Sequence, residues 1–251
     1  MLEPMLFLIA AVFLLAGFVK GVLGLGLPTV SMGLLVVAMQ PNRALAIVIA
    51  PAIITNIWQT FGGPYLRDIV RRLWPLMLCT VIGSLMSAGA MNGPYARYGT
   101  VALGLLLVIY AVIGLTQFRL HLERRNEAWI GGIIGLVTGV ISAFTGVQVI
   151  PSVPFIQTIG MERDELVQAL GVFFTVATLA LSVNVSASGL FTPATAIPGV
   201  VALTCSFAGM FVGQKLRARM RTQTFRHWFL IGMILLGVYL AASALYELAA
   251  R

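Results

Sequence analysis

The sequence predicts an all-α polytopic membrane protein of two inverted repeats, each a broken or re-entrant helix pair followed by three transmembrane helices. Three observations support this fold class. Of the 251 residues, 59% are hydrophobic and only 10% are charged, whereas soluble domains carry about 25% charged residues. Apolar stretches long enough to span a bilayer recur along the whole chain. They run continuously instead of alternating with polar residues, which favours helices over a β-barrel.

The apolar stretches give the expected elements in chain order. Most are long enough to cross a hydrocarbon core of about 30 Å. Two are shorter, and at about 13 residues 28–40 and 147–159 reach only ~20 Å as helix. Each follows a stretch that ends in glycine and small residues, so we expect two broken helices or re-entrant hairpins. The stretches are 5–25, 28–40, 44–61, 73–91, 95–117, 128–145, 147–159, 166–187, 194–213 and 225–249.

The basic residues predict the orientation in the membrane. If both ends of each broken pair face one side of the membrane, the connections 62–72, 118–127, 160–165 and 214–227 all lie on one side and carry most of the 16 basic residues. Cytoplasmic loops are enriched in lysine and arginine, so these connections are expected in the cytoplasm and both termini outside. This distribution accounts for the net charge of +8 without a nucleic-acid partner. The expected cytoplasmic residues are Arg67, Arg71, Arg72, Arg119, Arg124, Arg125, Arg163, Lys215, Arg217, Arg219, Arg221 and Arg226, whereas Arg43, Arg97 and Arg251 face outside.

A weak internal similarity predicts a duplicated unit. Gly17-Phe-Val-Lys-Gly21 matches Gly135-Leu-Val-Thr-Gly139, and after a two-residue gap Gly26 matches Gly146. Matches in the same order pair Arg43 with Arg163, Cys79 and Gly83 with Cys205 and Gly209, and Leu103-Gly104 with Ile231-Gly232. We therefore expect a first repeat over 1–124 and a second over 125–251 in one integrated transmembrane domain. The halves begin on opposite sides, and inverted repeats with discontinuous helices are typical of secondary transporters that bind substrate near the midplane.

The first break carries the strongest candidate site. Lys20 is the single basic residue that this topology places in neither a loop nor a terminus. Gly24 and Gly26 let the backbone turn and approach a ligand, and Pro28 suits the first turn of a new helix. Because a helix that begins inside the membrane exposes N–H groups and a partial positive charge, we expect Lys20 and the break through Thr29 to bind an oxyanion. The alternative is that Lys20 snorkels to the interface.

The second break is the weaker counterpart of the first. The same argument from an exposed helix start applies to Thr145, Gly146 and Gln148. No cation accompanies these residues in the sequence. They are expected to contact the same substrate through their hydrogen-bond donors.

Polar side chains of two spanning segments extend the candidate site. Asn56, Gln59 and Thr60 share one helix face in the segment 44–61, and Thr175 and Thr178 form a stripe in 166–187. Polar residues inside a membrane are costly and commonly mark a substrate path. We expect them to donate to an oxyanion from both halves, and the alternative is hydrogen bonding between helices.

Three runs carry a resemblance to a known family. They are "AGFVKGVLGLGLPTVSMGLL", its weaker echo "IGLVTGVISAFTGVQVIPSVPFI", and the closing "GMFVGQKLRARMRTQTFRHWFLIGMILLGVYLAAS". Together they resemble the TauE/SafE family of sulfite exporters over nearly the whole chain. The resemblance implies a carrier of small anions, notably sulfite and organosulfonates such as sulfoacetate, in a bacterial inner membrane.

The expected function is secondary transport, with export of a small anion by alternating access around a midplane site. A passive anion channel and a transporter of small carboxylates are the alternatives. The expected partners are the anion and the lipid bilayer, with no nucleic acid, no metal and no cofactor; proton coupling stays open because no carboxylate lies in the core of a predicted span. Catalysis is not expected, since His121 and His227 lie in or beside loops and no buried aspartate is available for an intramembrane enzyme.

Overall fold

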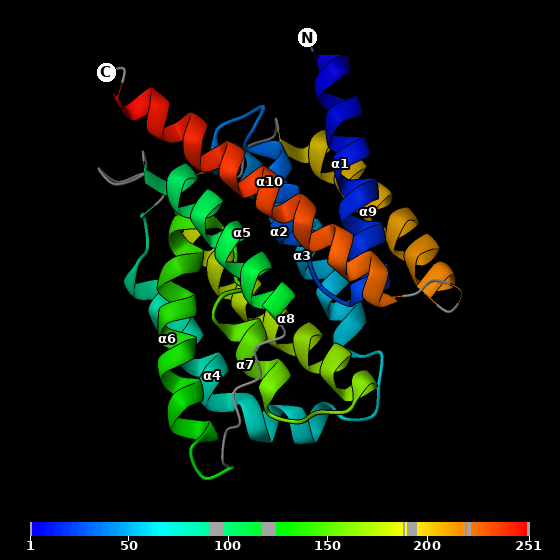
Figure 1. The fold of residues 1–251 in the computed structure, drawn as a ribbon, viewed down its shortest axis with the longest axis vertical. Helices are drawn as coiled ribbons and strands as arrows, with labels where there is room; N and C mark the ends of the chain where they lie inside the picture. Colours follow the sequence, from blue (N-terminus) through cyan, green and yellow to red (C-terminus); the bar gives the residue numbers. More distant parts are fainter. Residues whose placement is uncertain are drawn as a thin grey trace.

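The computed structural model describes residues 2–90, 98–116, 124–187, 189, 195–217, 219 and 222–249, and these residues form helices and their connections, with no strand among them (Figure 1). Among the described residues, eight helices are long and apolar enough to cross a membrane. The prediction of an all-α, multi-pass membrane protein is therefore confirmed. The helices are α1 (Leu2–Leu23), α2 (Leu27–Leu35), α3 (Pro41–Thr60), α4 (Leu66–Met86), α5 (Gly99–Thr116), α6 (Glu127–Thr145), α7 (Ser152–Thr158), α8 (Arg163–Ala187), α9 (Ala196–Arg217) and α10 (Thr222–Ala249).

The two predicted short elements are present and are shorter than expected. Helix α2 has nine residues and α7 has seven. Each follows a long helix: α1 has 22 residues, which is about 33 Å of helix and enough to span the bilayer. Each broken pair is thus a full-length helix followed by a short one.

A left-handed glycine ends the long helix of each pair. Gly24 has a φ of 78° and Gly146 a φ of 72°. The Gly24 N–H donates to the Lys20 carbonyl at 2.7 Å, and the Gly146 N–H to the Ser142 carbonyl at 2.8 Å. In the structure, the residue that corresponds to Gly146 is therefore Gly24. The sequence comparison had matched Gly146 with Gly26 instead. The counterpart of Lys20 becomes Ser142, one helical turn from the expected Thr138.

The main helix contacts join the first half of the chain to the second. Helix α1 packs on α9, α4 on α6, α5 on α10 and α3 on α8. Glycines allow two of these contacts to be close: a methyl group at Gly17 would overlap the Ser206 carbonyl oxygen, and one at Gly139 would overlap that of Thr80. Close backbone approach through small residues is a general basis for helix association in membranes. The halves therefore share one helical bundle, while the inverted repeat itself and its boundary at 124 stay predictions.

The positions of the helix ends agree with the predicted topology, in which both termini lie on one side and the basic connections on the other. The start of α1 and the end of α10 lie toward the same end of the molecule, and the starts of α4 and α6 lie toward the other (Figure 1). Which end faces the cytoplasm stays a prediction. Among the residues used above, Arg97, Arg119, His121, Arg221 and Arg251 lie outside the described residues.

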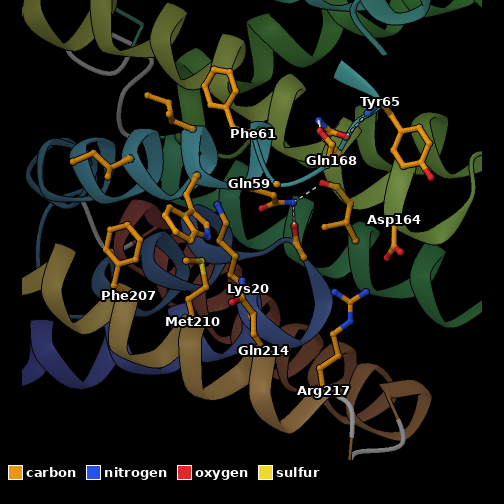
Figure 2. A pocket seen from close by; sticks show the side chains of 18 of the residues that line it. Lys20, Gln59, Phe61, Tyr65, Asp164, Gln168, Phe207, Met210, Gln214 and Arg217 are labelled. Atoms are coloured by element: carbon orange, nitrogen blue, oxygen red, sulfur yellow. Dashed lines mark hydrogen bonds between the residues drawn. The ribbon is translucent and has the colours of Figure 1, made fainter. Parts of the chain in front are cut away.

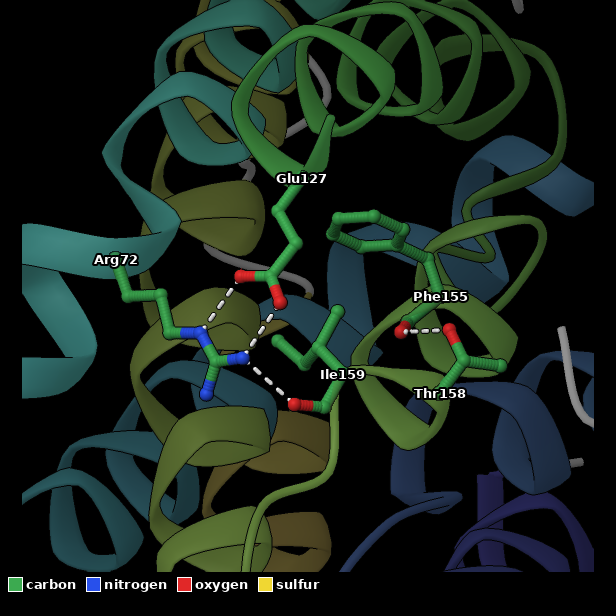
Figure 3. Close-up of polar contacts among 5 residues, drawn as sticks. All are labelled: Arg72, Glu127, Phe155, Thr158 and Ile159. Atoms are coloured by element: carbon green, nitrogen blue, oxygen red, sulfur yellow. Dashed lines mark hydrogen bonds and ion pairs between the residues drawn. The ribbon is translucent and has the colours of Figure 1, made fainter. Parts of the chain in front are cut away.

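One of the expected loop cations has a structural role near the second break. The Arg72 guanidinium in α4 forms a bidentate ion pair with Glu127 in the first turn of α6, with N–O distances of 2.8 and 2.7 Å (Figure 3). It also donates to the Ile159 carbonyl at the end of α7 at 2.6 Å. Bidentate arginine pairs are among the stronger charge-assisted contacts. Arg72 therefore ties α4, α6 and α7 together.

Candidate functional site

The Lys20 side chain turns into the protein. Only 3% of the residue is exposed, and its Nζ donates to Asn56 Oδ1 and, at 3.1 Å, to Thr55 Oγ1. Both partners lie on α3, which follows α1 and α2 in the chain. Lys20 is therefore held by protein groups and does not extend along the surface toward an interface.

Asn56 brings a second polar group to this position. Its carboxamide is fully buried, and its Nδ2 has no hydrogen-bond partner among the described residues. Thr55 differs, because its hydroxyl donates back to the Pro51 carbonyl at 2.7 Å. A buried donor without a partner costs about 1–3 kcal/mol. This amide nitrogen is therefore an unsatisfied donor next to a lysine.

Lys20 lines a pocket of about 830 Å³ beside the first break (Figure 2). The lysine points into it, Phe207 and Met210 of α9 lie on one side, and Gln168 and Asp164 of α8 on another. The lining residues come from α1, the break between α1 and α2, α3, the α3–α4 connection, α8 and α9. They are Lys20, Gly21, Gly24, Ile54, Ile57, Trp58, Gln59, Phe61, Gly62, Gly63, Pro64, Tyr65, Asp164, Val167, Gln168, Phe207, Met210, Gln214 and Arg217.

Gln59 fixes the break to the second half of the chain. Its Nε2 donates to the Gly24 carbonyl at 2.7 Å and to the Val167 carbonyl at 2.6 Å. These two bonds use both hydrogens of the amide group. In this conformation Gln59 therefore positions the break, and its predicted donation to an anion stays a prediction.

Gln168 of α8 makes the complementary set of bonds and was missed in the sequence analysis. Its Nε2 donates to the carbonyls of Thr60 and Gly63, each at 2.8 Å, and its Oε1 accepts from the Tyr65 N–H at 2.9 Å. A glutamine in an apolar segment is itself a signal of such a role. Gln168 holds the end of α3 and its connection to α4 in the wall of the pocket.

The second break has neutral groups that satisfy one another. Gln148 is 2% exposed, and its Oε1 accepts from the Thr178 hydroxyl at 3.1 Å. The Thr145 hydroxyl donates to the Ile141 carbonyl at 2.8 Å and accepts from the Val147 N–H at 3.3 Å. None of these side chains lines the pocket.

The predicted residues thus fall into two groups. Lys20, Gly24 and Gln59 line the pocket, and Asn56 lies behind it as a partner of Lys20. The others do not line it; Thr175 makes a 3.0 Å hydrogen bond to Thr60, which does not line the pocket either. Those outside the lining are Gly26, Pro28, Thr29, Thr145, Gly146, Gln148, Thr175 and Thr178. Their role as ligands of the substrate stays a prediction.

Comparison with known proteins gives one family. No curated protein and no solved structure matches the chain at a significant level. The family described as "Sulfite exporter TauE/SafE" matches residues 9–240. This range contains both breaks, all of the pocket and most of α10, and it confirms the resemblance noted in the sequence. The chain therefore belongs to the TauE/SafE family of sulfite exporters.

Proposed function

We propose that this protein exports a small anion, sulfite or an organosulfonate such as sulfoacetate, across a bacterial inner membrane, and that Lys20 binds the anion. One observation carries the proposal: a lysine buried inside a spanning helix lines a pocket beside an amide donor, Asn56 Nδ2, that has no partner. A cation and an unpaired donor together favour an oxyanion, because hydrogen bonds to a charged group are stronger than neutral ones.

The geometry of the break also favours an anion over a cation. The Gly24 carbonyl oxygen accepts a hydrogen bond from Gln59, so this partial negative charge already has a donor. Helix α2 begins three residues later, after Gly26, with Pro28 in its first turn. The start of a helix carries a partial positive charge. The Lys20 ammonium and the start of α2 therefore add positive charge beside the break, opposite the partial negative charge at the end of α1, in whose last turn Lys20 lies.

The position of the pocket along the helices fits loading from the cytoplasm. Its lining includes Asp164 at the start of α8 and Arg217 at the end of α9, and the prediction from basic residues assigns these helix ends to the cytoplasm. Export by alternating access would then require the site to close here and open toward the other side. Because α1 packs on α9 and α4 on α6, each moving unit would contain helices from both halves of the chain.

The test is sulfite flux in proteoliposomes with a Lys20→Ala variant. We expect a loss of about ten- to a hundredfold in affinity or rate, because a hydrogen bond to a charged group contributes about 1.5–3 kcal/mol. Lys215 is the other lysine of the chain, is exposed and does not line the pocket, so Lys215→Ala is the matched control. Equal flux in the wild type and in a correctly folded Lys20→Ala variant would reject this site.

The same vesicles separate a transporter from a channel. A channel carries the anion only down its own electrochemical gradient, whereas a coupled exporter accumulates it when a proton gradient is imposed. Small carboxylates such as acetate form a second substrate panel. Flux of carboxylates without flux of sulfite or sulfonates would contradict the proposed substrate class.

A further inference from the structure

We infer that a second pocket, at the starts of α8 and α10, binds the phosphate group of an anionic phospholipid. The inference goes beyond the proposed function and does not depend on it. Three features lead to it: two arginines that line one pocket, neutral hydrogen-bond donors beside them, and a position at the membrane surface.

The second pocket has a volume of about 600 Å³. Its described lining residues are Arg163, Thr222, Gln223, Thr224 and Arg226. Arg163 is the first residue of α8, and the other four lie in the first two turns of α10. The volume is within the range of about 300–1,000 Å³ found for ligand pockets, so the pocket has room for a lipid headgroup.

The two arginines of this lining have no carboxylate partner. The ion pair that the described residues form is Arg72 with Glu127, and neither Arg163 nor Arg226 takes part in one. Arg226 donates to the Gly114 carbonyl at the end of α5 at 3.4 Å, which uses one of the five N–H groups of a guanidinium. The planar guanidinium matches a phosphate group with two parallel hydrogen bonds. Both arginines therefore have N–H groups available for phosphate oxygens.

The other described lining residues add neutral donors. Thr222 and Thr224 each carry a hydroxyl group and Gln223 carries a carboxamide, and all three groups can donate to an oxyanion. The acidic neighbours of Arg163 in the chain, Glu162 and Asp164, do not line this pocket. The described lining therefore offers positive charge and donors to a phosphate group, with no carboxylate to repel it.

The position of the pocket favours a lipid over a soluble phosphate. Helices α8 and α10 are both long and apolar enough to span the bilayer, so their first residues lie near a membrane surface. Trp228, two residues after Arg226, is 68% exposed, and tryptophan is enriched at membrane interfaces. The predicted topology assigns both helix starts to the cytoplasm, where basic pockets between membrane helices bind anionic headgroups. An anionic phospholipid of the cytoplasmic leaflet is therefore the ligand that fits this pocket.

Two arginines of α4 separate this site from a general orientation signal. Arg67 and Arg71 are expected on the same side of the membrane, are exposed and line neither pocket. If loop arginines served orientation alone, either pair would affect lipid binding equally. The pocket predicts that only Arg163 and Arg226 matter.

The test is native mass spectrometry of the full chain in detergent, with phosphatidylglycerol as the probe. Phosphatidylcholine and diacylglycerol with the same acyl chains are the controls, because the first adds a cation to the phosphodiester and the second lacks the phosphate. Inorganic phosphate is titrated separately to detect a soluble source. We expect saturable binding of phosphatidylglycerol that is tighter than binding of either control lipid, and no saturable binding of inorganic phosphate.

Matched double variants assign this binding to the pocket. Arg163→Gln combined with Arg226→Gln should weaken binding of phosphatidylglycerol about 25-fold, or about fivefold for each arginine. Arg67→Gln combined with Arg71→Gln removes the same charge and should stay within about twofold of the wild type. Arg163→Gln alone, at an exposed position, should give the fivefold loss if the double variant does not fold.

The other results would overturn the inference in different ways. Equal losses in the two double variants would show a general effect of charge and no site. Binding of phosphatidylglycerol no tighter than that of phosphatidylcholine, with inorganic phosphate binding lost in Arg163→Gln, would overturn the lipid source of the phosphate. No saturable binding of either probe would overturn the phosphate site itself. The two pockets share no described lining residue, so these results leave the proposed function as it stands.

Discussion

The two breaks share a backbone and differ in chemistry. Gly24 and Gly146 have nearly the same φ, and each N–H donates to the carbonyl four residues earlier. The residue at that earlier position is Lys20 in the first break and Ser142 in the second. Lys20 reaches across to α3 and lines a pocket, whereas the Ser142 hydroxyl donates at 2.8 Å to the Gly139 carbonyl within its own helix.

This difference shows that the glycine turn alone does not make a binding site. A left-handed glycine satisfies the end of a helix wherever the chain must reverse, and needs no ligand to do so. A binding site requires in addition polar groups that the protein leaves unsatisfied. The first break has such a group in Asn56 Nδ2. At the second break, Gln148 Oε1 is paired with Thr178. The first break is therefore where a ligand gains the most.

The largest effect should come from reversing the electrostatics of the first break with Asn56→Asp. The substitution keeps the shape of the side chain and places a carboxylate against Lys20. A negative charge about 4 Å from the bound anion repels it by about 4 kcal/mol at an effective dielectric constant of about 20. We expect at least a hundredfold loss of sulfite affinity and flux, while the ion pair with Lys20 preserves the fold.

The control for this variant is Asn126→Asp, because Asn126 is an exposed residue immediately before α6. Its flux should match the wild type. Proteoliposome flux and calorimetry measure both variants, and far-ultraviolet circular dichroism checks that the helices persist. Wild-type sulfite affinity in Asn56→Asp would place the anion somewhere other than Lys20.

A smaller effect is expected from releasing the first break with Gln59→Leu. The Gly24 carbonyl loses its donor, and an unsatisfied carbonyl costs about 1–3 kcal/mol. We expect the free energy of unfolding in mixed micelles to fall by that amount, with a loss of flux because Gly24 is no longer held against α8. Gln157→Leu, on the exposed face of α7, should leave both unchanged. Full stability in Gln59→Leu would show that Gly24 finds another donor.

The sequence was sufficient for the helices and for singling out Lys20, which the structure buries at the first break and places in the lining of the pocket. Lys20 was identifiable because an isolated cation in an apolar run has few structural explanations, and the break because glycines precede Pro28. The register between the halves was one turn off, since glycines four residues apart allow two alignments. Trp58 was missed as a residue that lines the pocket, because the sequence does not distinguish an aromatic residue that contacts lipid from one that lines a pocket.

The smallest effect tests the second break directly, through Thr178→Val. The substitution removes one hydrogen bond to Gln148, and such bonds between membrane helices average about 0.6 kcal/mol. We expect a loss of stability of that size and sulfite flux within about twofold of the wild type. Thr204→Val on the exposed surface of α9, where the hydroxyl bonds only within its own helix, sets the baseline. A tenfold drop in flux at this modest cost in stability would instead mean that Thr178 meets the substrate in another conformation, as the sequence predicts, and that both breaks contribute to one site.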